Sequence, residues 1–254
     1  MSATAVRVSP AWLALREKAD AAARSGELAE RLARHLPAGR LEIHDLGGGS
    51  GAMGRWLAPR LPASQHWVVH DRDDDLLRLA SATFETRRSD ITRLTTADLA
   101  GASLITASAL LDLLTREELN RMLAACSGRP MLLALNVVGR VALSPAGALD
   151  ARIGAAFNAH QRRGDLLGPN AVAAAIDELR ATRAEVLVRS SPWRLDAAHA
   201  DLTAQWLEGW VVAACEQAPE LAAEAGAYCD RRLAQAAAGE LAVTVDHADL
   251  LVLP

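Results

Sequence analysis

A glycine-rich turn between a strand pattern and a helix pattern constrains the fold of this chain more than any other feature. Residues 41–46 alternate as a strand does and run straight into Gly47-Gly48-Gly49-Ser50-Gly51. A helical spacing of apolar residues follows, through Met53, Trp56, Leu57 and Leu61. Glycines at such a turn adopt positive φ and let the backbone approach a ligand closely, and the amides of the next helix favour polar or anionic groups. The turn therefore predicts a ligand site at the end of the first strand.

Strand and helix patterns continue to alternate after this turn. Strand patterns occupy residues 66–70, 83–88, 104–106 and 130–135, and helical patterns run from about residue 74 to 82 and from Thr115 to about Cys126. The segment 130–135 is wholly apolar, as expected of a strand with helices on both faces. This alternation predicts a parallel sheet with right-handed crossovers.

Helical patterns flank this central region. Ser9-Pro10 predicts the start of a helix that ends at Gly26, and a second helix is expected over 27–36. After the fifth strand we expect helices within 144–168 and over 169–180, a strand at 185–189 and two Ala-rich helices within 196–238. The apolar segment 241–253 has no helix behind it and is expected to pair antiparallel at the sheet edge.

These elements predict an α/β fold with a Rossmann-like seven-stranded sheet. The sheet is expected to be mostly parallel with an antiparallel last strand, helices on both faces and an N-terminal helical leader. No internal repeat or linker divides the chain, so we expect a single domain over 1–254. Within it, 1–37 would be the leader, 38–136 the cofactor-binding core, and 137–254 the acceptor-side elaboration with the last strands.

Composition narrows the class of protein. Apolar residues make up 51% of the 254 residues, which is ample for a packed core. The formal net charge of -4 offers no basic patch for phosphates, so nucleic acid is a disfavoured partner. Cys126, Cys215 and Cys229 are too scattered for a disulfide framework or a zinc site, and we expect no metal. The chain lacks an apolar run of about 18 residues and its first ten residues do not resemble a signal peptide, so we expect a cytoplasmic protein with no membrane partner.

The glycine turn by itself fits two kinds of cofactor. Gly47-x-Gly49-x-x-Ala52 satisfies the dinucleotide fingerprint, and Asp71 follows about 20 residues on, where a ribose-binding carboxylate is wanted. Asp45, however, stands two residues before the first glycine. A carboxylate there would repel a pyrophosphate, whereas it suits the ammonium group of an amino acid. The helices before the first strand and the strand after the last helices also favour a cofactor with an amino-acid group over a dinucleotide.

The order and spacing of four motifs resemble those of the class I S-adenosylmethionine-dependent methyltransferases, of the bacterial small-molecule type. The motifs are Asp45 to Gly51, His70-Asp71, Ser89-Asp90-Ile91 and the fourth strand, which ends in Ala107-Ser108. The resemblance covers the chain from about residue 38 to the end, and the leader segment 12–25 is also similar to that of bacterial small-molecule members. It implies S-adenosyl-L-methionine as the cofactor.

The resemblance also implies roles for individual residues. Gly47, Gly49 and Gly51 would cradle the methionine part of the cofactor, and Arg24 would pair with its carboxylate. Asp71 would accept hydrogen bonds from both ribose hydroxyls. Asp90 would meet the adenine amino group, and Ile91 and Met53 would lie beside the ring. Further residues would complete the predicted cofactor site: Asp45, Arg72, Ala107 and Ser108.

Residues that follow the fourth and fifth strands are candidates for the acceptor side, because ligands of open α/β sheets bind beyond the carboxyl ends of the strands. His160 is the first candidate base, although it also fits an exposed helix end. Asp112 is a lone carboxylate in an apolar run, where burial would raise its pKa, although it also fits a helix cap. Asn136, Asn158 and Trp193 are predicted to contact the acceptor.

Two further tryptophans share a helix face. Trp206 and Trp210 are four residues apart. They would either bury their helix on the sheet or line a pocket, and such a pocket would favour an aromatic or a cationic acceptor.

These features predict methyl transfer to a small molecule, such as a metabolite or an intermediate of secondary metabolism. Three alternatives stay open. A methyltransferase acting on nucleic acid such as rRNA would need a basic face, and the arginines are dispersed. An NAD(P)-dependent oxidoreductase would lack a Tyr-x-x-x-Lys pair, because Tyr228 and Lys18 are the only residues of their types. A cofactor-binding protein without catalysis is the third. The oligomeric state is also open, a homodimer included.

Overall fold

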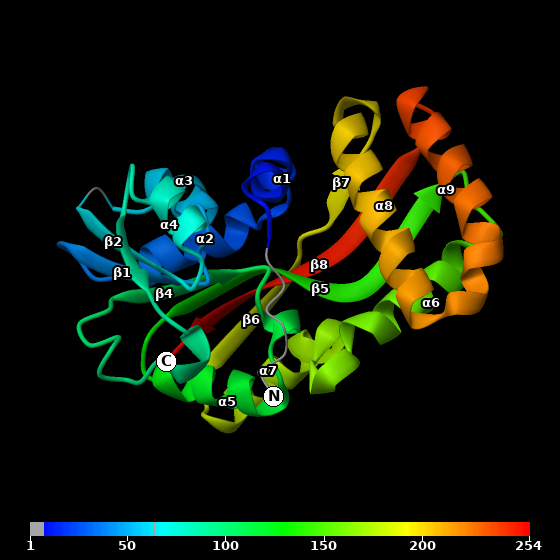
Figure 1. Cartoon of the computed structure of the whole chain (residues 1–254). Coiled ribbons are helices and arrows are strands. Elements are labelled where there is room, and N and C mark those ends of the chain that lie inside the picture. Colours follow the sequence, from blue (N-terminus) through cyan, green and yellow to red (C-terminus); the bar gives the residue numbers. More distant parts are fainter. Residues whose placement is uncertain (1–7, 63) are drawn as a thin grey trace.

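The computed structural model describes residues 8–62 and 64–254, and they form one eight-stranded mixed sheet covered by helices (Figure 1). The expectation that the first ten residues are not a signal peptide concerns a segment that lies mostly outside the described residues. The strand order is β3-β2-β1-β4-β5-β8-β6, and β7 pairs with β8 alone. The strands are β1 Leu41–Leu46, β2 Gln65–Asp71, β3 Glu85–Arg88, β4 Leu104–Ser108, β5 Met131–Ser144, β6 Glu185–Ser190, β7 Trp193–Leu195 and β8 Ala242–Leu253.

The first five strands are parallel, and β8 runs antiparallel to both of its long neighbours. The predicted Rossmann-like sheet with an antiparallel last strand is therefore confirmed, with β7 as an additional short strand. The expectation that β8 lies at the sheet edge is wrong, because β8 lies between β5 and β6. Its apolar residues 250–253 are buried, which an interior position provides and an edge would not.

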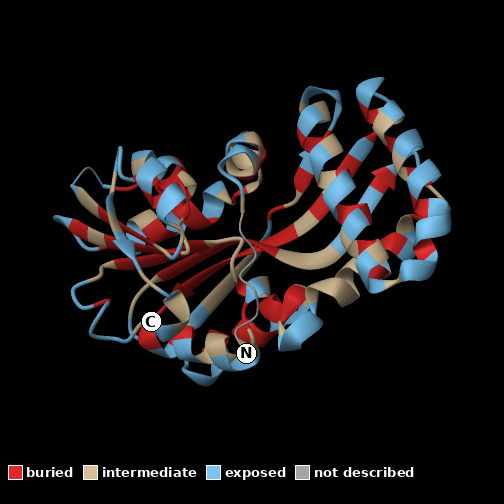
Figure 2. Cartoon of the chain, viewed as in Figure 1, coloured by how far each residue is buried: buried red, intermediate tan, exposed pale blue. Residues whose placement is uncertain are grey.

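Helices cover both faces of the sheet. The α2 and α3 helices share a core with β1, whereas α5 and α7 pack on the opposite face against β4 and β5. Figure 2 shows the buried residues concentrated along the central strands. No helix in the described ranges is both long and apolar enough to span a membrane. The helices are α1 Pro10–Ala23, α2 Gly26–His35, α3 Ala52–Leu57, α4 Asp74–Ala80, α5 Arg116–Ala125, α6 Asp150–Gln161, α7 Ala171–Ala181, α8 Ala200–Gln217 and α9 Ala222–Ala237.

The β5 and β8 strands are longer than the rest of the sheet requires. The strand predicted at 130–135 continues to Ser144, with register shifts after Leu133 and Val137. The outer halves of β5 and β8 pair with each other, and β7 pairs with the outer half of β8. They carry α6, α8 and α9 around a second apolar core that includes Trp193, Trp210 and Tyr228. Figure 1 shows this region extending beyond the parallel strands. The chain thus adds a helical unit beside the parallel part of the sheet.

The leader consists of α1 and α2, and the break between them lies two residues earlier than predicted. Gly26 begins α2 instead of ending α1, because the Ser25 side chain accepts a hydrogen bond from the Leu28 amide and caps the second helix. Arg24 is thereby placed at the junction of the two helices. In Figure 1, α1 lies above the sheet, between the region of α3 and α4 and the region of β7 and α8.

A buried carboxylate joins the leader to the sheet. Asp249 of β8 is 1% exposed. It accepts hydrogen bonds from the Ser25 amide (2.8 Å), the Leu135 amide (2.7 Å) and the Ser191 hydroxyl (2.6 Å). Leu135 has a φ of +54°, which a leucine adopts only when its surroundings compensate for the strain. One side chain therefore fixes the leader junction, the irregular part of β5 and the connection from β6 to β7.

Candidate cofactor site

The glycine turn connects β1 to α3 at the carboxyl edge of the sheet. Gly47, Gly49 and Gly51 have φ values of +61°, +54° and +82°, so the residue type follows from the backbone conformation. Asp71, at the end of β2, accepts a hydrogen bond from the Gly49 amide (2.9 Å) through Oδ2 and one from the Asp73 amide (3.0 Å) through Oδ1. A carboxylate has about four acceptor positions, so Asp71 both holds the turn and keeps capacity for a ligand hydroxyl.

Asp45 is fully buried beneath the turn. Its Oδ1 accepts a hydrogen bond from the Thr106 hydroxyl of β4 (2.7 Å), whereas its Oδ2 is buried without a partner in the described part of the chain. Burial raises the pKa of Asp45 to about 7, and the Thr106 hydrogen bond and the Arg24 charge oppose this rise. A Cβ atom on Gly48 would lie 2.4 Å from Asp45 Oδ2, so the turn approaches the carboxylate as closely as glycine allows.

Arg24 is near enough to Asp45 for their charges to interact, and it has unused hydrogen-bond donors. Its Nη2 donates to the Ser108 hydroxyl at the end of β4 (3.1 Å), and its guanidinium carbon is 5.6 Å from the Trp56 ring centroid. The Nε and Nη1 groups are buried, and no described residue accepts from them. Burial lowers the pKa of Arg24, while the charges of Asp20, Asp45 and Asp249 oppose this effect. Two buried groups of opposite charge thus retain open hydrogen-bond capacity in one place.

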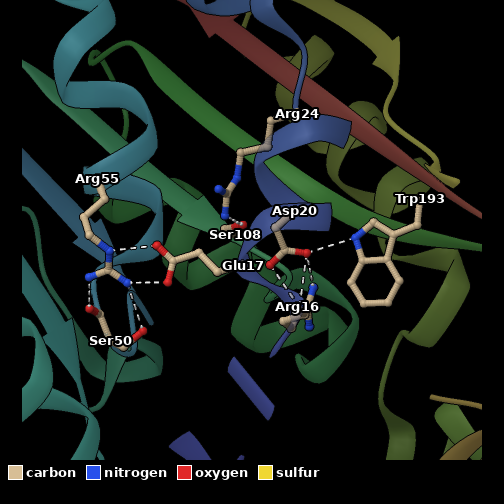
Figure 3. A network of polar contacts seen from close by, with 8 residues as sticks. All are labelled: Arg16, Glu17, Asp20, Arg24, Ser50, Arg55, Ser108 and Trp193. Carbon is tan, nitrogen blue, oxygen red and sulfur yellow. Dashed lines mark hydrogen bonds and ion pairs between the residues drawn. The ribbon is translucent and has the colours of Figure 1, made fainter. Parts of the chain in front are cut away.

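The α1 helix is tied to the turn and to the outer unit at once, as Figure 3 shows. Glu17 accepts two hydrogen bonds from Arg55 of α3 (2.8 and 2.7 Å), and Arg55 also donates to the Ser50 carbonyl (2.6 Å). The Arg55 hydrogen bond lowers the pKa of Glu17.

On the other side of α1, Asp20 accepts from Arg16 (2.9 Å) and from the Trp193 Nε1 of β7 (2.9 Å). Leu13 covers the turn, with its Cδ1 3.3 Å from the position of a Cβ on Gly49.

Comparison with solved structures supports the assignment of the fold. The structure of the YcgJ protein from Bacillus subtilis superposes with a TM-score of 0.50 and covers 90% of this chain and 97% of that chain, at 10% sequence identity. The same sheet has three features together: the glycine turn after β1, a carboxylate at the end of β2, and an antiparallel strand inserted between β5 and β6. The chain has the fold of the class I S-adenosylmethionine-dependent methyltransferases.

Other similar structures include a cyclopropane synthase and a methyltransferase. The cyclopropane synthase MmaA2 from Mycobacterium tuberculosis is 12% identical, with a TM-score of 0.47 and coverage of 89% of this chain and 82% of that chain. The plantazolicin methyltransferase BpumL, in complex with SAH, is 10% identical, with a TM-score of 0.49 and coverage of 95% and 86%. Neither a scan against protein-family models nor a search of curated proteins finds a match.

The structure brings most of the predicted cofactor residues to one edge of the sheet. Ala107 is buried at the end of β4 beside Ser108, and Arg72 is exposed directly after β2. Asp90 caps the short helical turn η2 (Ile91–Arg93), accepting hydrogen bonds from the Thr92 amide (3.0 Å) and hydroxyl (2.7 Å). Ile91 is half-buried. Met53 is 2% exposed and belongs to the apolar core shared by α2, α3 and β1. A contact with the adenine stays a prediction for Asp90, Ile91 and Met53.

The candidate bases lie in two different places. Asp112 is half-buried in the turn η3 (Leu111–Leu113) after β4, where burial raises its pKa to about 6 and Arg16 of α1 lowers it. His160 lies at the end of α6, and its Nε2 is 2.8 Å from Glu216 Oε2 of α8. Its other contact is with Arg163. Asp112 is thus near the leader helix that covers the glycine turn, whereas the partners of His160 belong to the outer helical unit.

The three predicted acceptor residues make contacts within the protein. Asn136 is buried, and its side-chain amide donates to the Leu133 and Ala248 carbonyls (2.9 and 3.0 Å), which stabilises the irregular part of β5. Asn158 donates to the Gly139 carbonyl (2.7 Å). Trp193 is 3% exposed and bonded to Asp20. Contact with an acceptor stays a prediction for all three.

Sequence reasoning missed several residues of the site. Thr106, Glu17, Asp20 and Arg55 all take part in the contacts described above. The spacing of Arg16 and Asp20, an i,i+4 pair, was the only local signal for any of them. Within residues 8–62 and 64–254 no cluster of three or more His, Cys, Asp and Glu side chains could hold a metal ion.

The raised pKa of Asp45 predicts a pH-dependent stability that Asp45→Asn removes. The folded state keeps the proton up to about pH 7, while the unfolded state loses it near the ordinary pKa of 3.8. The folded state therefore binds more protons between these values, and this contribution to stability decreases as pH rises through the window. We expect the free energy of unfolding of wild type, relative to Asp45→Asn, to fall from about pH 4 to about pH 7. Urea unfolding at several pH values measures it, and a constant difference would contradict the prediction.

Proposed function

We propose that this protein is an S-adenosylmethionine-dependent methyltransferase that acts on a small molecule. The observation that carries the proposal is the pair Arg24 and Asp45, whose Nε, Nη1 and Oδ2 atoms are buried and unsatisfied by any described residue. Buried polar groups normally have partners, so these atoms indicate a ligand with one anionic and one cationic group. The amino-acid end of S-adenosylmethionine has both. A dinucleotide would instead bring its pyrophosphate towards Asp45, which disfavours the oxidoreductase alternative.

The remaining residues of the edge fit the rest of this cofactor. Arg24 would bind the carboxylate and Asp45 the ammonium group, while the backbone of the glycine turn lies beside the methionine part. Asp71 would bind the ribose hydroxyls, and Asp90 and Ile91 the adenine, with Arg72, Ala107 and Ser108 nearby. When bound, the cofactor supplies an electrophilic methyl group on a sulfonium.

The protein then has to align the acceptor, exclude water and, where needed, take up a proton. Leu13 covers the glycine turn, and the Glu17–Arg55 ion pair holds α1 in that place. With a pKa of about 6, Asp112 is ionised at neutral pH and would accept a proton. His160 is the second candidate base. A small acceptor is favoured by the net charge of -4 and by the helical unit beside the site.

Calorimetric titration of the purified protein tests the cofactor assignment. We expect micromolar binding of S-adenosylmethionine and S-adenosylhomocysteine and no binding of NADH or NADPH. Binding of a nicotinamide nucleotide alone would contradict the proposal. Methyl transfer to a member of an acceptor library would then distinguish an enzyme from a protein that binds the cofactor without turnover.

Asp71→Ala should weaken S-adenosylmethionine binding. Loss of hydrogen bonds to a charged group costs about 1.5–3 kcal/mol, which corresponds to a roughly 10- to 150-fold higher Kd. Asp74→Ala is the matched control, because Asp74 is an exposed residue of the same acidic segment. Equal calorimetric affinities of Asp71→Ala and Asp74→Ala would remove Asp71 from the site.

Asp112→Asn and His160→Ala should spare cofactor binding and lower turnover. Removal of a general base reduces the rate by about 10²–10⁴-fold, and we expect the larger loss in Asp112→Asn. Turnover of the wild type should rise with pH through about 6 and lose this rise in Asp112→Asn. Unchanged turnover in both variants, measured with an identified acceptor, would reject both assignments.

A further inference from the structure

Four of the nine aromatic residues of this chain line a single cavity outside the glycine turn. The chain has six Trp, two Phe and one Tyr, so aromatic side chains are scarce. The cavity has a volume of about 290 Å³ and lies between α1, α6 and α8. Its lining residues are Trp12, Phe157, Gln205, Trp206, Gly209 and Trp210. The volume of this cavity is close to the lower limit of small-molecule sites, and its aromatic lining suits an aromatic ligand.

Three of the rings are partly exposed, and the fourth carries a buried donor without a partner in the described residues. Trp206 and Trp210 are stacked, with centroids 5.2 Å apart and planes inclined by 20°. Trp12, Phe157 and Trp206 are only half-buried, so their faces are not fully used in the core. Trp210 is buried, and its Nε1 donates to no atom in the described residues. A buried indole N–H usually has a hydrogen-bond partner, so the site is suited to a planar ligand that carries an acceptor atom.

The charges around the cavity favour a neutral ligand over a cation. None of the six lining residues is charged. Aromatic faces attract cations, but the neighbouring cation position is taken by Arg16, which lies 6.0 Å from the Trp12 ring centroid and 4.8 Å from that of Trp193. Asp20 already pairs with Arg16. A second cation beside Trp12 would meet this guanidinium with no lining carboxylate to offset the repulsion.

The cavity adjoins the candidate cofactor site across α1. Trp12 lines the cavity, and the next residue, Leu13, contacts the glycine turn at Gly49. We propose that the cavity binds the flat, neutral aromatic part of the methyl acceptor, with an acceptor atom on that ring system receiving the Trp210 N–H. This inference rests on the proposed methyltransferase function and names the acceptor class for it.

The probe for this site is 2-naphthol, a neutral planar compound with one hydroxyl, titrated into the full chain by calorimetry. Gly209 and Gly226 provide a matched pair of variants, because an added Cβ at either helical glycine meets no described atom within 4 Å. Gly209 lines the cavity, whereas Gly226 is on α9. We expect saturable binding to wild type and to Gly226→Leu, and a Kd at least about tenfold higher in Gly209→Leu, from lost ring contacts. Trp206→Leu should weaken binding to a similar degree.

Three results would overturn the inference: no saturable binding of 2-naphthol, undiminished binding in both Gly209→Leu and Trp206→Leu, or tighter binding of phenyltrimethylammonium than of 2-naphthol. Titration of the same proteins with S-adenosylmethionine separates this inference from the proposed function. If the cofactor binds and 2-naphthol does not, the acceptor class is wrong and the proposed function stands. If 2-naphthol binds at the cavity and the cofactor does not, the proposed function fails, and with it the assignment of the cavity to a methyl acceptor.

Discussion

Arg24→Met should nearly abolish S-adenosylmethionine binding and change the stability of the protein less than it changes binding. The buried guanidinium has one hydrogen bond, to Ser108, and two donors that no described residue satisfies. Removing one partner of a buried charge pair costs about 2–5 kcal/mol of binding free energy, which corresponds to a loss of roughly 30- to 5,000-fold. The unliganded protein, in contrast, loses a desolvated cation and keeps an apolar stem of similar length. We expect its free energy of unfolding to change less than the binding free energy, because Asp45, with a pKa of about 7, can take up a proton when the neighbouring charge is lost.

Calorimetry and urea unfolding of the same preparations measure both effects. Arg31→Met is the control, because Arg31 is an exposed residue of α2 paired with Glu185, and it should change neither quantity. A large loss of stability with unchanged cofactor affinity would show that Arg24 serves the fold, through Ser108 and the charge of Asp45, and would remove the observation on which the proposed function depends.

Gly48→Ala should also abolish cofactor binding, for a steric reason. Gly48 does not have positive φ, but an added Cβ would lie 2.4 Å from Asp45 Oδ2 and 2.9 Å from Val69 Cγ1. The turn or the buried carboxylate must therefore move. Overpacking of this kind costs about 1–3 kcal/mol of stability. A displacement of about 1 Å at a binding site is enough for a roughly hundredfold functional loss.

Gly26→Ala is the matched control for this change. Gly26 also has an ordinary φ, and a Cβ there meets no described atom within 4 Å. Thermal unfolding and calorimetric titration should show wild-type behaviour for Gly26→Ala and losses in both measurements for Gly48→Ala. Equal behaviour of the two variants would mean that the turn tolerates displacement and that the close approach to Asp45 has no role in binding.

Local patterns predicted the elements whose causes are local. The bounds of β1 agree with the alternating pattern of 41–46, and Thr115 caps α5 by the reciprocal hydrogen bonds with Glu118 that its spacing predicts. The parallel pairing of the first five strands followed from the alternation of strand and helix patterns. The outer half of β5 was missed because its register shifts interrupt the alternation that marks a strand. The interior position of β8 was missed because the position of a strand in a sheet depends on partners far away in the chain.

The residues of the candidate site show the same difference between local and tertiary causes. Asp45 and the glycines were found because they are consecutive and their chemistry depends on a turn. Glu17, Arg55 and Thr106 come from three separate elements, and only tertiary packing brings them together at the site. His160 belonged to a conspicuous polar segment, but its ion pair with Glu216 depends on the alignment of α6 with α8, which the sequence of either helix does not reveal.

The position of α1 has a thermodynamic consequence. The helix is bonded to the glycine turn through Glu17 and Arg55 and to β7 through Asp20 and Trp193, and its Trp12 lines the aromatic cavity. A ligand that shifts α1 at one of these places necessarily alters the energy of the other. Such coupling is reciprocal: the factor by which the first ligand changes the affinity for the second equals the factor by which the second changes the affinity for the first. We therefore expect the proposed cofactor and acceptor to change each other's affinity by the same factor, through the contacts of α1.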